Sequence, residues 1–176
     1  MSTRPVSPAP APSASTRTRA KDMADQTAPE RVRGLPSRLL SLTTLQAERL
    51  VGAGLATENV RTWHFVVLVA LTEAGPASQS TLSRRTGVHR SDMVAVINDL
   101  TERGLVQRAP DPEDRRRNVI TVTTEGRSQL RRLDEIINAA QDELLAPLSQ
   151  AERGQLTELL RRVLDHHVKA AHHEGK

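Results

Sequence analysis

Apolar residues recur at helical spacing over most of the chain that follows residue 34. Leu35, Leu39, Leu42 and Leu45 fall three or four residues apart, which predicts an amphipathic helix over residues 35–55 that closes at its glycines. Similar spacing predicts helices over residues 58–73, 79–86, 89–103, 124–145 and 149–170. The pattern therefore predicts a mainly α-helical fold.

Residues 105–123 break this helical pattern. Two short β-type runs, residues 105–108 and 118–123, flank a loop from Pro110 to Arg117 in which six of eight residues are charged. Pro110 and Pro112 disfavour regular strand pairing in that loop. We therefore predict a β-hairpin with a strongly charged tip.

Local signals set the helix boundaries around the hairpin. Gly75-Pro76 ends one helix, Ser78 is a predicted N-cap for residues 79–86, and Gly87 follows that helix as a C-terminal glycine. Downstream, Thr124 is a predicted helix cap, and Ser149-Gln-Ala-Glu152 matches a capping box.

Two short helices joined at Gly87-Val88 have the form of a helix–turn–helix. In the second helix Met93, Ile97 and Leu100 share one face, which we expect to anchor the core. We therefore expect the opposite face, with Arg90, Val94 and Asn98, to lie outward.

Each of these outward residues can contact a base edge in the major groove. Arg90 matches guanine, Asn98 can pair with adenine through two hydrogen bonds, and Val94 can touch a thymine methyl group. Ser91 lies beside them in the first turn, where such helices contact DNA. The other predicted DNA contacts are Ser78 and Gln79, and Asp114, Arg115, Arg116 and Arg117 of the hairpin tip.

The alternative interpretation of the helix residues is an ordinary solvent-exposed face. For the arginines of the loop it is a solvent-exposed run of charges. The order of elements, a helix–turn–helix followed directly by an arginine-rich hairpin, favours double-stranded DNA as the partner. A module that binds an acidic protein instead remains the alternative function. An enzyme is disfavoured, since we find no Gly-rich phosphate loop, metal cluster or nucleophile–base pair in the sequence.

Composition narrows the class of protein further. The chain has no cysteine, which excludes disulfides and Cys-ligated zinc, and Trp63 and Phe65 are its only aromatic residues. No apolar run approaches the roughly 20 residues that span a bilayer. We expect a cytoplasmic protein with no cofactor.

Residues 1–34 form a predicted disordered tail, rich in Pro, Ala, Ser, Thr and Arg. The tail can add phosphate contacts, act as a targeting peptide or lack a specific role, and the last is favoured. Residues 171–176 are predicted to be a flexible C-terminus. The net charge of +4 resides mostly in the N-terminal tail, so DNA binding would depend on local clusters of basic residues.

The block from Trp63 to Gly126 resembles the MarR family of winged-helix transcription regulators. Its hairpin sequence, DRRRNVITVT followed by Gly126, is similar to the family signature D-x-R-x-x-x-(V/I)-x-L-T-x-x-G, with Val122 in place of the usual leucine. His89 stands where that family often has an acidic or serine-like cap. The resemblance covers about residues 35–170 and implies a winged helix–turn–helix, with helix–turn–helix 78–104 and wing 105–123.

The resemblance also implies a homodimer, formed by helices 35–55 and 124–170, that represses a pseudo-palindromic operator. Arg116 would lie in the minor groove, with Asp114 orienting it. A small anionic or phenolic effector would release the DNA.

Trp63 and His64 are candidate effector contacts. The favoured interpretation is instead that Trp63 belongs to the core and that His64 is a partly exposed helix residue. The pairs His166-His167 and His172-His173 suggest a metal site, but a solvated helix end explains them better.

Overall fold

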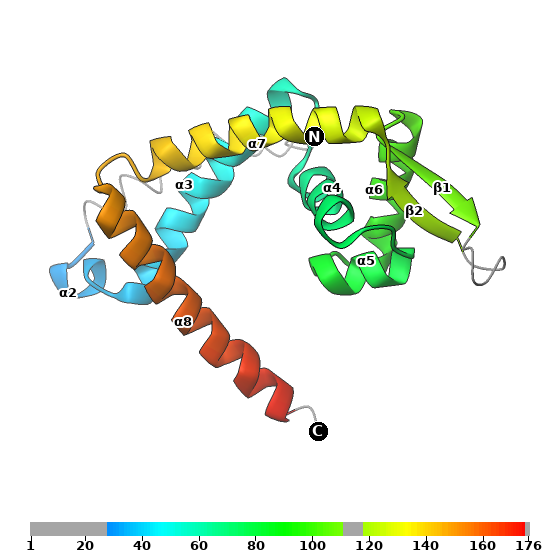
Figure 1. Cartoon of the computed structure of the whole chain (residues 1–176). Coiled ribbons are helices and arrows are strands. Elements are labelled where there is room, and N and C mark those ends of the chain that lie inside the picture. The colour runs from blue at the N-terminus through cyan, green and yellow to red at the C-terminus, as the bar shows by residue number, and fades with distance from the viewer. Residues whose placement is uncertain (1–27, 111–117, 175–176) are drawn as a thin grey trace, which may run out of the picture. The chain divides into compact units, whose positions relative to one another are not determined.

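Helices dominate the described residues, 28–110 and 118–174, of this computed structural model (Figure 1). The only sheet within those residues is the antiparallel pair β1–β2. The prediction of a mainly α-helical fold with a small β-wing is therefore confirmed. In chain order the elements are α2 Glu30–Arg33, α3 Pro36–Thr57, α4 Thr62–Ala74, α5 Gln79–Thr86, α6 Arg90–Glu102, β1 Val106–Pro110, β2 Asn118–Val122, α7 Thr124–Leu144 and α8 Gln150–Glu174.

The predicted N-terminal tail lies mostly outside the described residues. Four residues assigned to it, Glu30–Arg33, form the short helix α2. The chain divides into two compact units, residues 1–45 and 46–176. Helix α3 begins in the first unit and ends in the second, which also contains every element from α4 to α8.

Helix α5 has the predicted boundaries, and α6 is one residue shorter at each end than the predicted range 89–103. Ser78 caps α5, because its Oγ accepts a hydrogen bond from the backbone N–H of Thr81 at 3.2 Å. Gly87 follows α5 with φ at +72°, a left-handed conformation that glycine adopts without strain. The next helix, α6, buries Met93, Ile97 and Leu100 completely, as its spacing predicted.

The wing follows α6, and its backbone is anchored to the start of α5. Arg108 pairs with Ile120, and Pro110 pairs with Asn118. Pro110 was predicted to belong to the loop, but it is the last residue of β1. Proline has no backbone N–H to donate, and it is tolerated here because both strands of a two-stranded sheet are edge strands. Ala77 and Ile120 exchange two backbone hydrogen bonds of 3.1 and 2.9 Å, which hold β2 against the entrance to α5.

Two predicted boundaries around α3 and α4 were wrong. Helix α3 continues through its glycines to Thr57, because Gly54 allows a close approach: a Cβ there would lie 2.7 Å from Cγ2 of Ile136 in α7. Helix α4 begins at Thr62 rather than Glu58, since Asn59 at φ +54° forms a turn between the two helices. The first error concerns packing against α7, whereas the second concerns a local turn, in which the N–H groups of Asn59 and Val60 donate to the carbonyl oxygens of Ala56 and Leu55.

The two long C-terminal helices start at side-chain caps. Helix α7 is capped by Thr123, not by the predicted Thr124, because Oγ1 of Thr123 accepts from the N–H of Gly126 at 3.0 Å. The predicted capping box of α8 is confirmed, with the N–H of Ser149 donating to Glu152 at 2.8 Å and that of Glu152 to Ser149 at 3.4 Å. Helix α8 continues to Glu174, beyond the predicted end near Ala170.

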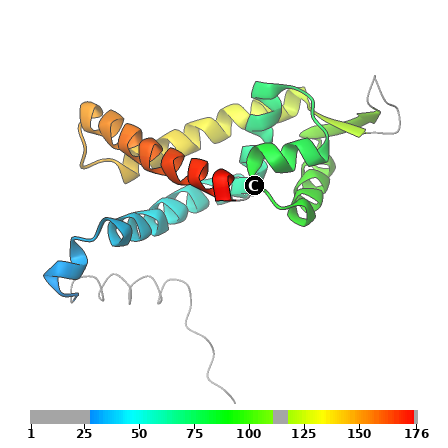
Figure 2. The same cartoon turned by 90° about the horizontal axis from the view of Figure 1, so that it is seen from below.

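Aliphatic side chains from the C-terminal end of α3 through α7 form one core. Helices α4, α5 and α6 pack beside the wing (Figures 1 and 2). No aromatic residue belongs to the buried part of this core as described; Trp63 is 46% exposed and Phe65 is half-buried. Fully buried members of the core are Leu55, Val67, Leu68, Leu82, Met93, Ile97, Leu100 and Leu133.

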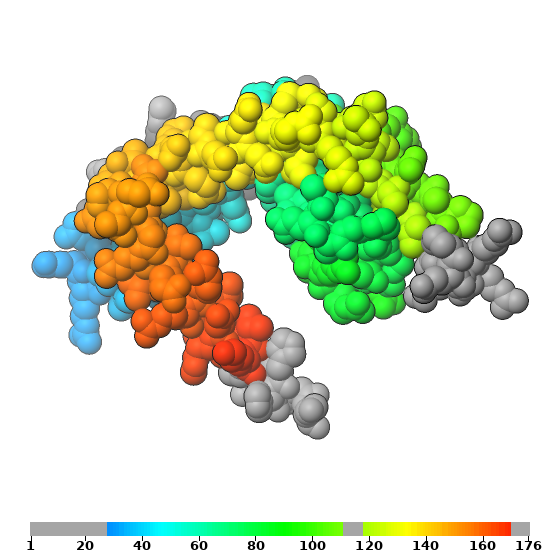
Figure 3. Space-filling view, in the orientation of Figure 1, coloured from blue at the N-terminus to red at the C-terminus, as the bar shows by residue number. Residues whose placement is uncertain are grey.

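Helices α3 and α8 carry large apolar side chains that the core does not use. On α3, Leu39 is 51% exposed. Between Gln150 and Lys169, no described side chain of α8 is buried, and Val163 and Leu164 are 53% and 63% exposed; Figure 3 shows the α8 surface in orange and red. No helix in the described part of the chain has the length and apolar character needed to cross a membrane.

Candidate nucleic-acid interface

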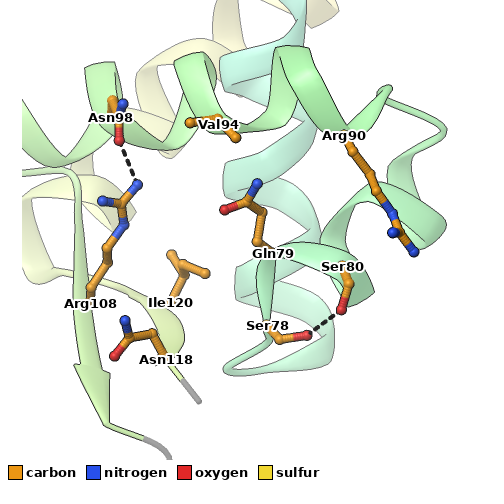
Figure 4. Close-up of a pocket in the computed structure, with 9 residues that line it drawn as sticks. All are labelled: Ser78, Gln79, Ser80, Arg90, Val94, Asn98, Arg108, Asn118 and Ile120. Carbon is orange, nitrogen blue, oxygen red and sulfur yellow. Dashed lines mark hydrogen bonds between the residues drawn. The ribbon is translucent and has the colours of Figure 1, made fainter. Parts of the chain in front are cut away.

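A groove of about 510 Å³ runs between the helix–turn–helix and the wing (Figure 4). Its walls come from the start of α5, the outward face of α6, and the two strands of the wing. We call it the reading groove. Nine described residues line it: Ser78, Gln79, Ser80, Arg90, Val94, Asn98, Arg108, Asn118 and Ile120.

Five of the predicted DNA contacts meet in the reading groove: Ser78, Gln79, Arg90, Val94 and Asn98. Ser91 is not part of its lining, and its Oγ lies 2.9 Å from Nδ1 of His89. The predicted contacts Asp114, Arg115, Arg116 and Arg117 lie outside the described residues.

Sequence reasoning missed four lining residues: Ser80, Arg108, Asn118 and Ile120. Strand alternation could have indicated Arg108, because it shares a face of β1 with the buried Val106 and lies opposite the buried Ile120. That face points toward the helices, so a long side chain at position 108 reaches α6. Ser80 could have been found from its place two residues after the Ser78 cap, whose Oγ lies 3.0 Å from its own.

The chemistry of the reading groove is basic and polar. Arg90 lies at one end, and Arg108 at the other donates from Nη2 to Oδ1 of Asn98 at 2.6 Å (Figure 4). None of the nine described residues that line the groove is acidic. Guanidinium, amide and hydroxyl groups arranged around an apolar Val94 match the mixture of acceptors, donors and methyl groups on base edges.

A second, smaller hollow of about 350 Å³ lies where α3, α4 and α6 approach one another. We call it the His64 hollow. Its lining residues are Ala56, Asn59, Val60, Arg61, His64 and Asp99.

The favoured interpretation of Trp63 and His64 was wrong for both residues. Trp63 is 46% exposed and does not line the His64 hollow, whereas His64 is only 1% exposed. The cause is the start of α4 at Thr62, since His64 then falls in the first turn and its Nδ1 accepts from the N–H of Arg61 at 3.1 Å.

The buried imidazole of His64 faces charged neighbours. Its Nε2 lies 2.9 Å from Oδ2 of Asp99 on α6, although the two atoms are not aligned for a hydrogen bond. Burial lowers the pKa of His64 below its ordinary value of 6.5; Arg61 and Arg103 act in the same direction, and the Asp99 carboxylate opposes them. His64 is therefore held as a neutral side chain near neutral pH.

A neutral, buried His64 makes folding stability depend on pH. As the pH falls below 6.5, His64 binds a proton in the unfolded chain but stays neutral in the folded chain. The free energy of unfolding should therefore decrease between about pH 7 and pH 5. His64→Asn, which keeps an acceptor near the position of Nδ1, should show a smaller decrease. Urea denaturation across this range compares the slopes, and equal slopes would show that His64 is not the group responsible.

Of the two histidine pairs considered as a metal site, His166-His167 has described side chains, and those of His172-His173 lie outside the described part of the chain. His166 and His167 are exposed, with ring centroids 5.1 Å apart. The described residues contain no group of three or more His, Cys, Asp or Glu side chains that could hold a metal ion.

Helices α5 and α6 joined by a glycine turn, followed by an antiparallel hairpin, define a winged helix–turn–helix protein. The family follows from comparison with known proteins. A sequence profile of the MarR family matches residues 59–117. The PcaV transcriptional regulator from Streptomyces coelicolor, solved in complex with its natural ligand, is 32% identical with a TM-score of 0.65, covering 79% of this chain and 98% of that one. The chain belongs to the MarR family of transcription regulators.

Two curated relatives agree with this assignment. A putative transcriptional regulatory protein for the hcr operon of Thauera aromatica is 36% identical over 107 residues, which are 61% of this chain. The HTH-type transcriptional repressor NicR of Pseudomonas putida is 33% identical over 101 residues, or 57% of this chain. In both cases the chain spans 64% of the relative's length.

Proposed function

We propose that the protein is a cytoplasmic homodimeric repressor that binds a pseudo-palindromic DNA operator and is released by a small ligand. The reading groove carries this proposal. In this groove Arg90, Val94 and Asn98 of α6 lie together with polar groups of α5 and the wing. None of its described lining residues is acidic. A helix that presents such groups suits the major groove of B-DNA.

The wing supplies the second part of the proposed contact. Its tip residues Asp114–Arg117 lie outside the described residues and follow the ordered strand β1. Arginines suit the narrow minor groove, where the negative potential is enhanced. We assign the minor-groove contact to Arg116 and the orienting carboxylate to Asp114.

The apolar residues of α3 and α8 support a homodimer. Leu39, Val163 and Leu164 are each more than half exposed, although the core elsewhere is well buried. Large exposed apolar surfaces are typical of protein–protein contacts. A two-fold dimer would place two α6 helices in successive major grooves, about one helical turn apart.

The repressor and ligand parts of the proposal draw on relatives. The Pseudomonas putida relative is named a repressor, and the Streptomyces coelicolor regulator was solved with a natural ligand. In this chain the His64 hollow is the candidate site for a small anionic or phenolic effector, with Arg61 supplying a positive charge and His64 a buried polar group. Trp63, which lies outside the lining, is a weaker candidate.

Arg90→Ala tests the proposed base contact. The variant should lose about 1–3 kcal/mol of discrimination at one position in each half-site and keep its preference elsewhere. Selection from a random duplex library, followed by sequencing, measures this change. Arg131→Ala is the charge-matched control, since Arg131 is an exposed residue of α7 outside the reading groove. An unchanged base profile in the Arg90 variant would contradict the proposed role.

A further inference from the structure

The contact between Arg108 and Asn98 joins the wing to the outward face of α6. Nη2 of Arg108 donates to Oδ1 of Asn98 at 2.6 Å, and both side chains line the reading groove (Figure 4). The two residues are ten positions apart in the sequence and lie on different elements. The helical spacing of α6 does not predict this pair, because the pair joins α6 to the first strand of the wing.

Buried neighbours fix the backbone on both sides of the pair. Asn98 follows Ile97, which is completely buried in the core. Arg108 pairs across the wing with Ile120, which is 2% exposed and is bound to Ala77 by two backbone hydrogen bonds. The two Cα atoms are therefore held in place, and only the side chains are free to adjust.

The hydrogen-bonding groups of Arg108 and Asn98 determine how the Asn98 amide is oriented. A guanidinium carries only donors, whereas an asparagine amide has an acceptor oxygen and a donor NH₂ group. Arg108 can therefore bind only Oδ1 of Asn98, which directs Nδ2 away from the wing. An asparagine that pairs with adenine through two hydrogen bonds needs its oxygen for the adenine amino group. In this protein Arg108 occupies one of the two lone pairs of that oxygen, which makes the oxygen a weaker acceptor for adenine and Nδ2 a stronger donor.

We propose that Arg108 is a positioning residue that fixes the amide of Asn98, so that Asn98 donates from Nδ2 to an acceptor edge, with guanine preferred, instead of pairing with adenine. The inference rests on the proposed function, because it concerns which base the same groove selects. Guanine presents two major-groove acceptors, N7 and O6, whereas adenine presents one acceptor beside a donor. Asn98 then specifies guanine because of a residue in the wing.

Selection of duplexes from a random library tests the inference with the wild type, three variants of the pair and one control variant. Asn98→Ala identifies the position in the half-site that depends on Asn98. At that position the wild type should prefer guanine over adenine by about ten-fold or more, in line with the usual discrimination of a good base contact. Arg108→Met should reduce this preference and raise the share of adenine, because the released amide can rotate to use its oxygen.

Asn98→Asp gives an independent result that does not rely on removing Arg108. The aspartate keeps an acceptor for Arg108 but has no donor, so the preference should move from guanine to cytosine or adenine, which present an amino group in the major groove. Gln107→Met is the matched control, because Gln107 is the exposed neighbour of Arg108 on the opposite face of β1. It should leave the selected sequence unchanged.

Two results would overturn the inference while leaving the proposed function intact. One is a wild type that prefers adenine at the Asn98 position. The other is an Arg108→Met variant that keeps the wild-type base profile but binds all sequences more weakly, with a smaller salt dependence, because that behaviour identifies a phosphate contact. A wild type that selects no sequence at all would instead overturn the proposed function, and this inference with it.

Discussion

Gly126→Ala is expected to lower the free energy of unfolding by about 3 kcal/mol, at the upper end of what overpacking a core usually costs. Gly126 is buried in the first turn of α7, where the helix passes the start of the wing. A Cβ at this position would lie 2.0 Å from the carbonyl oxygen of Leu105 and 2.8 Å from Cγ2 of Val122. Neither distance is compatible with an unmoved backbone.

The backbone near Gly126 has little freedom to relieve this clash. The carbonyl oxygen of Leu105 accepts from the N–H of Thr123 at 3.1 Å, and Oγ1 of Thr123 in turn caps α7 through the N–H of Gly126. Moving either segment breaks the cap or the turn that ends the wing. Urea denaturation followed by circular dichroism, at one fixed protein concentration, measures the change.

Gly52→Ala is the matched control for this prediction. Gly52 is exposed within α3, and a Cβ there meets nothing within 4 Å among the described atoms. Alanine at a helical position of this kind should raise the free energy of unfolding by about 0.5–1 kcal/mol. If Gly126→Ala proved as stable as the wild type, the packing described for α7 against the wing would be wrong.

Introducing two glutamates on α8, Leu160→Glu with Leu164→Glu, is expected to abolish the proposed dimer. These residues are 41% and 63% exposed, so the variant should still fold, but unpaired carboxylates would be buried in the interface. Sedimentation velocity should show a monomer where the wild type is a dimer. Operator affinity should fall by about 100-fold or more, because the two half-sites are then bound independently.

A charge-matched double variant separates the loss of apolar surface from a general effect of charge. Gln155→Glu with Arg162→Gln changes the charge of α8 by the same amount, at exposed positions on the opposite side of the helix. This variant should remain dimeric and bind the operator. A Leu160 and Leu164 variant that stays dimeric would exclude this face of α8 from the interface.

The sequence predicts the helix–turn–helix well because its signals are local. The Ser78 cap, the Gly87 turn and the spacing of Met93, Ile97 and Leu100 all act within a few residues, and each is found as predicted. The outward face of α6 follows from the same spacing. The order of a helix–turn–helix followed by a hairpin was also predicted from local patterns, and α5, α6, β1 and β2 confirm it.

Contacts between distant segments account for what the sequence does not predict. Gly54 looks like a helix terminator, but it lies inside α3 because Ile136 packs against it. His64 looks like a surface residue, yet the late start of α4 buries it beside Asp99. The bond from Arg108 to Asn98 depends on the register of the wing, which residues 105–123 do not fix by themselves.

The most direct test of the proposed function is selection of bound duplexes from genomic DNA fragments with the full-length wild-type protein, read out by sequencing. We predict enrichment of an inverted repeat whose half-sites lie about one helical turn apart. Failure to enrich any sequence, at low salt and without added ligand, would contradict recognition of an operator by the reading groove and would favour a protein partner for the same surface.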